Sequence, residues 1–159
     1  MSYNLISNSV KLGYEFEDLI HNIISQSEYI VLRENDIVKT YGQTVYGIDH
    51  MIKTTNFLVL IQDKWKNSKP GLQDINHFTK ATERISDIEH KRCLCIYLSK
   101  YPITSYAEQA FNVENNKRLN RFITISSESQ QQIIKILTRI LYNNKIYFYE
   151  SDGSAIMIR

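Results

Sequence analysis

The sequence predicts an α/β domain with a mixed central β-sheet and helices on both faces. Short apolar runs rich in β-branched residues alternate along the chain with segments whose apolar residues recur every three or four positions, which indicates strands alternating with amphipathic helices. The run Cys93–Leu98 is apolar throughout. Such a run is expected of a central strand that is covered on both faces.

Length and composition indicate one globular domain. The chain has 159 residues, of which 43% are hydrophobic and 23% charged, so it can bury an ordinary core and has no room for a large disordered arm. The formal net charge of +2 excludes a polybasic tail. Any binding of nucleic acid must therefore rely on a local basic cleft.

The first part of the chain predicts one helix, one strand and a loop. Apolar residues at helical spacing predict an amphipathic helix over residues 14–26, and a β-branched run predicts a strand over residues 29–32. Residues 39–46 have no clear period and are interpreted as a loop or an irregular strand. Lys39 and Tyr41 in this segment suit contact with a nucleic acid, although ordinary surface residues of these types are equally common.

A β-hairpin is predicted over residues 47–65, where four polar residues separate two apolar runs. Side chains alternate along a strand, so Gln62 and Lys64 share one face and Asp63 takes the other. Antiparallel pairing places Asp49 opposite Gln62 or the residue before it. A carboxylate, an amide oxygen and an ammonium group therefore converge at the polar end of the hairpin.

These three groups fit a hard divalent cation and a phosphodiester together. Mg²⁺ takes a few protein oxygens and keeps several waters, one of which can act as a nucleophile, and Mn²⁺ is expected to substitute. We interpret Asp49 and Gln62 as metal ligands and Lys64 as the group that activates the water or holds the phosphate. The alternative is that these side chains merely reach solvent, since the spacing is common.

The rest of the chain predicts a basic loop and further helices and strands. Lys66 and Lys69 follow in the loop. They are interpreted either as contacts for the backbone of a nucleic-acid substrate or as solvated surface charges. A helix over residues 72–86 comes next, with Asp74 in its first turn suited to capping. The later predicted elements are strands over 93–98 and 122–125, a helix beginning at Ser105, a helix over 127–142, and a C-terminal β-hairpin formed by residues 146–149 and 155–158.

The cysteines and the N-terminus suggest a soluble intracellular protein, and they do not distinguish the cytoplasm from the nucleus or nucleoid. Cys93 and Cys95 are too close in sequence for an ordinary disulfide and are interpreted as buried thiols. No apolar run approaches the roughly 20 residues that a membrane span requires, so no membrane partner is expected. The histidines lack the paired spacing of a zinc hydrolase, and His50, next to Asp49, is expected to pack.

Four short motifs occur in the order found in one nuclease family. They are Gly13–Glu17 at the start of a helix, Gly47–Asp49, Ile61–Lys64, and Ser105–Ala110 after a strand. With these motifs the chain resembles the Mrr-like restriction endonucleases, a branch of the PD-(D/E)XK nuclease superfamily in which Gln often replaces the acidic residue before x-Lys. The resemblance covers roughly residues 11–126.

The resemblance implies a restriction-endonuclease-like core in residues 1–142, with residues 143–159 as a hairpin extension on the same domain. It implies a Mg²⁺-dependent endodeoxyribonuclease that hydrolyses DNA phosphodiester bonds, in which Glu17 supports the metal from the first helix; Glu15 lies on the other flank of that helix. A homodimer is expected, since cutting both strands of a duplex with one site per chain takes two protomers or two visits. The alternatives are a catalytically weak DNA-binding module of the same fold, which the neutral Gln62 favours, and a resolvase of branched DNA such as a Holliday junction.

Overall fold

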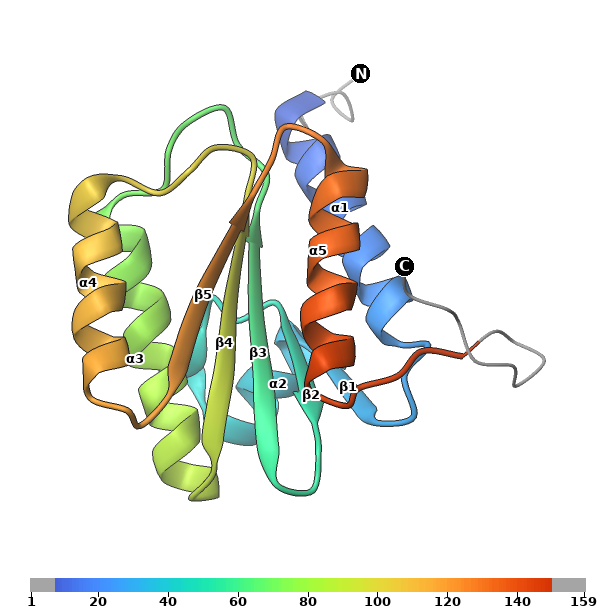
Figure 1. The fold of residues 1–159 in the computed structure, drawn as a ribbon, viewed down its shortest axis with the longest axis vertical. Helices are drawn as coiled ribbons and strands as arrows, with labels where there is room; N and C mark the ends of the chain where they lie inside the picture. The colour runs from blue at the N-terminus through green and yellow to red at the C-terminus, as the bar shows by residue number, and fades with distance from the viewer. Residues whose placement is uncertain (1–7, 150–159) are drawn as a thin grey trace.

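The computed structural model describes residues 8–149, which form a mixed five-stranded β-sheet whose strands follow chain order (Figure 1). β1 (Ile30–Arg33), β2 (His50–Lys53) and β3 (Phe57–Lys64) are antiparallel neighbours. β3, β4 (Arg92–Ser99) and β5 (Arg121–Ser126) run parallel. The predicted fold class, an α/β domain with a mixed sheet, is confirmed.

Helices cover both faces of the sheet, with α1 and α5 on one side and α3 and α4 on the other (Figure 1). Alternating side chains of β3 divide the core accordingly: Leu58 and Leu60 pack in the α3–α4 layer, whereas Val59 and Ile61 pack in the α1–α5 layer. The helices are α1 (Asn8–Ile24), α2 (Glu34–Tyr41), α3 (Leu72–Glu89), α4 (Ser105–Asn116) and α5 (Gln130–Asn143), with a short 3₁₀ turn, η2 (Gln43–Val45), after α2. None of the helices in residues 8–149 is long and apolar enough to cross a membrane.

The segment after β1 is helical where the sequence predicted only a loop from residue 39. Ile37 and Tyr41 lie four residues apart on α2, so both side chains face the core, and Tyr41 is only 6% exposed. The Tyr41 hydroxyl donates a hydrogen bond to Glu89. Tyr41 is therefore a core residue and not the surface contact for nucleic acid that was expected.

The end of the described chain packs beside the C-terminal end of α1. The Tyr149 amide donates to the Gln26 carbonyl at 2.9 Å, and Phe148 forms an isolated bridge with Ser27. Ile146 and Phe148 are buried in the α1–α5 core layer. The second run of the expected C-terminal hairpin, residues 155–158, lies outside the described residues. Cys93 and Cys95 are buried free thiols, as expected.

Candidate active site

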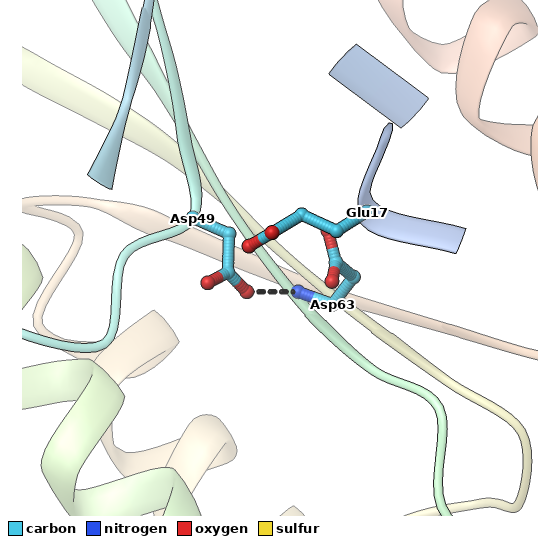
Figure 2. Close-up of side chains that lie close together, drawn as sticks. All are labelled: Glu17, Asp49 and Asp63. Atoms are coloured by element: carbon cyan, nitrogen blue, oxygen red, sulfur yellow. Dashed lines mark hydrogen bonds between the residues drawn. The ribbon is translucent and has the colours of Figure 1, made fainter. Parts of the chain in front are cut away.

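The register of the central hairpin places Asp49 opposite Gln62, as the sequence predicted. His50 pairs with Ile61, and the Asp49 amide donates to the Ile61 carbonyl at 3.0 Å. In return, the amide of Asp63 donates to Asp49 Oδ2 at 2.8 Å (Figure 2). Backbone hydrogen bonds on both sides thus fix Asp49 across the polar end of β3.

Gly47 gives the chain its path into this position. Its φ of +103° lies in the region that favours glycine, and a Cβ here would come within 2.8 Å of the His77 ring. The Gly47 amide donates to Glu34 Oε2 at 3.1 Å, which anchors the turn to the start of α2. The turn therefore requires glycine two residues before Asp49.

Three carboxylates converge beside this turn, and they come from three different elements. Glu17 lies on α1, Asp49 precedes β2, and Asp63 lies near the end of β3 (Figure 2). One oxygen from each carboxylate lies within 4.8 Å of the others. Burial, and then the charge of Asp63, raise the pKa of Asp49 well above its usual range. A divalent cation would relieve this crowding of negative charge, so the donor set fits a hard metal ion.

Each flanking carboxylate has a partner of its own. His50 Nε2 lies 2.5 Å from Asp63 Oδ2. Arg33 Nη2 donates to Glu17 Oε2 at 3.3 Å and to Asp18 Oδ1 at 2.7 Å. Since Arg33 is partly neutralised by Asp18, it leaves Glu17 with acceptor capacity for another cation.

Gln62 and Lys64 approach from the other side of β3 and line the same cleft, which has a volume of about 1010 Å³. The buried Gln62 Oε1 has no hydrogen-bond partner among residues 8–149. The Lys64 ammonium pairs with Asp74 on α3, and the second oxygen of Asp74 accepts from the Gly71 amide at 3.2 Å. Asp74 therefore caps its helix, as expected, and also holds the lysine.

The basic residues expected to bind nucleic acid are spread over the surface. Lys66 is exposed and lines the cleft. Lys69 is exposed in the same loop and Lys39 is exposed near the end of α2, and neither is among the residues that line the cleft. The structure thus brings one of these three lysines to the acidic site.

Comparisons with protein families and with curated proteins found no match to this chain. One solved structure, described as an EndoMS–dsDNA2 complex, matches 79% of this chain with a TM-score of 0.52 and 15% identity. The chain shares the fold of that protein. It spans about half of the matched chain, 48%.

Two other solved structures match less well. A repair endonuclease from Pyrococcus abyssi matches 50% of this chain and 32% of its own, with 14% identity and a TM-score of 0.39. A protein of unknown function, AF1548, matches 81% of this chain and 66% of its own, with 10% identity and a TM-score of 0.47.

Asp63 is the site residue that the sequence prediction missed. Alternation along β3 correctly separates it from Gln62 and Lys64, since Ile61, two residues earlier, packs in the α1–α5 layer. However, α1 covers that layer, and α1 carries Glu17. The acidic cluster therefore forms on the Asp63 side of the strand. Only the placement of α1 on the sheet could reveal this.

Proposed function

We propose that this chain is a metal-dependent endodeoxyribonuclease whose active site is the cleft at the polar end of β3. The observation that carries the proposal is the convergence of Glu17, Asp49 and Asp63 in a cleft that Lys64 also lines. Three crowded carboxylates suit a hard divalent cation, and a lysine that lines the same cleft suits an anionic substrate. This combination suits the metal-assisted hydrolysis of a phosphodiester.

Each residue has a distinct role in the proposed reaction. Glu17, Asp49 and Asp63 would hold Mg²⁺, with the amide oxygen of Gln62 as a further ligand or as the group that orients a water. Bound Mg²⁺ offsets charge on the phosphate and lowers the pKa of a coordinated water. Lys64, on the opposite side of the strand, holds the scissile phosphate or the attacking water.

DNA is the substrate to test first. The structure with which this chain shares its fold is described as a complex with double-stranded DNA. Lys66 lines the cleft, is exposed and can contact a phosphate of the DNA backbone. The resemblance to Mrr-like nucleases of the PD-(D/E)XK superfamily points to the same substrate class.

The test is to incubate the protein with plasmid, linear duplex, single-stranded and four-way-junction DNA, each with Mg²⁺, Mn²⁺ or EDTA. We expect internal cleavage of duplex DNA with either metal and none with EDTA. Cleavage confined to the junction would favour the resolvase. Binding without cleavage at any metal concentration would favour the DNA-binding module, and cleavage that persists in EDTA would overturn the metal-dependent site.

We also propose that the protein acts as a homodimer. The described residues of one chain supply one such cleft, so a cut through both strands takes two protomers or two successive visits. Sedimentation at micromolar concentration should show twice the mass of the 18.7 kDa chain. A protein that sediments as a monomer and still makes double-strand breaks in a single encounter would contradict the dimer.

A further inference from the structure

His50 and Asp63 form a buried pair that the roles given above leave unexplained. The His50 side chain is fully buried and that of Asp63 is 6% exposed. Their contact, from Nε2 to Oδ2, measures 2.5 Å. Burying a carboxylate this deeply costs free energy unless its oxygens have hydrogen-bond partners. The contact with His50 therefore replaces a hydrogen bond that Asp63 would otherwise make with water.

The fold fixes the histidine ring from two sides. On β2, His50 lies opposite Ile61 and two residues before Ile52, and both isoleucines face the α1–α5 core layer. Asp63, two residues after Ile61, is therefore a diagonal neighbour of His50 on the same face of the sheet. From α1, the ring of His21 stacks on that of His50 with centroids 5.8 Å apart.

A fixed ring also fixes the carboxylate that it contacts. The contact of Asp63 Oδ2 with His50 restricts rotation of the carboxylate group that supplies one oxygen to the acidic cluster. Partners that hold a metal ligand in this way affect affinity although they never touch the metal. Neither Glu17 nor Asp49 contacts His50 in the hydrogen bonds of the described residues, so the effect is directed at Asp63.

We propose that His50 is a positioning residue that holds Asp63 in the geometry for binding a divalent cation. The inference rests on the proposed function, since it assumes that the acidic cluster binds metal. It assigns a role to the residue that directly follows Asp49, for which the sequence favoured packing over catalysis.

Two amide substitutions test the role without changing the polar character of the site. The amide nitrogen of Gln in His50→Gln occupies roughly the place of Nε2, so it can still donate to Asp63. The shorter side chain of His50→Asn does not reach that far. Calorimetric titration of Mn²⁺ into the protein without DNA should show an affinity roughly 10- to 100-fold weaker for His50→Asn, and within a few-fold of wild type for His50→Gln.

The matched control is Thr82→Val, which removes another fully buried polar group, on α3 in the other core layer. It should lower the melting temperature and leave the affinity for Mn²⁺ unchanged. His50→Leu replaces His50→Asn if the latter does not fold, with the same loss expected.

The outcomes separate the inference from the proposed function. A wild-type protein that binds no Mn²⁺ would refute the metal site itself. If wild type binds Mn²⁺ and a folded His50→Asn or His50→Leu binds it equally well, the metal site stands and the positioning role of His50 is overturned. Loss of binding in His50→Gln to the same extent as in His50→Asn would also overturn it, because the contact to Asp63 would then be irrelevant.

Discussion

Replacing Asp49 by alanine is expected to lower the rate of DNA cleavage by about 1,000-fold, which corresponds to roughly 4 kcal/mol of transition-state stabilisation. Two hydrogen bonds fix Asp49 in the site. Its carboxylate accepts from the Asp63 amide, and its own amide donates to the Ile61 carbonyl. Its removal takes a ligand from the metal and an acceptor from the Asp63 amide. Metal ions contribute several kcal/mol in reactions of this class.

The fold should survive this substitution. Burial and the Asp63 carboxylate both raise the pKa of Asp49, which means that its charged form is disfavoured in the folded protein without metal. Asp49→Ala removes the cost of burying that carboxylate beside Asp63, which offsets the loss of the acceptor for the Asp63 amide, so the metal-free melting temperature should stay near that of wild type. Initial cleavage rates at saturating Mg²⁺, together with thermal melts, measure both effects. A folded Asp49→Ala protein with wild-type activity would remove Asp49 from the mechanism.

The position of Asp49 could be predicted from sequence because a hairpin fixes its own register. The short polar link between β2 and β3 and the alternation of side chains determine which residues face each other. The apolar runs also predicted all five strands, and the continuous run of β4 reflects a strand that is buried on both faces. Local patterns of this kind depend only on neighbours in the chain.

The membership of Asp63 in the site depends on long-range packing. The same alternation that placed Gln62 and Lys64 together placed Asp63 apart from them, and this was correct. The sequence does not show which face of the sheet α1 covers. That face determines which strand residues lie near Glu17. Tyr41 was expected on the surface and is buried. It lies four residues after Ile37 on the short helix α2, and only the position of α2 against the core shows that both side chains face inward.

Replacing Lys64 by alanine should also lower the rate of cleavage by about 1,000-fold. Lys64 lines the cleft from the face of β3 opposite to Asp63, so it approaches the substrate from the other side of the acidic cluster. Lys64 is the only basic residue of β3. Lys64→Arg keeps the charge and should recover only part of the rate, because the guanidinium group is larger and planar.

Asp74 makes the prediction for Lys64 more specific. Its carboxylate pairs with Lys64 and also caps α3 through the Gly71 amide, so it ties the lysine to the start of a helix. Asp74→Asn keeps a hydrogen-bond acceptor for the cap and removes the charge that holds Lys64. We expect it to lower kcat by roughly 10-fold, the effect of losing about 1.4 kcal/mol, with little change in metal affinity.

Thr104→Ala provides the control for the loss of a helix cap. Thr104 caps α4 by accepting from the Ala107 amide at 3.3 Å, and it does not line the cleft. This variant should lose about 1 kcal/mol of stability and keep its cleavage rate. A wild-type cleavage rate in Lys64→Ala would show that Lys64 has no part in catalysis. A wild-type rate in Asp74→Asn would show that the ion pair does not position the lysine.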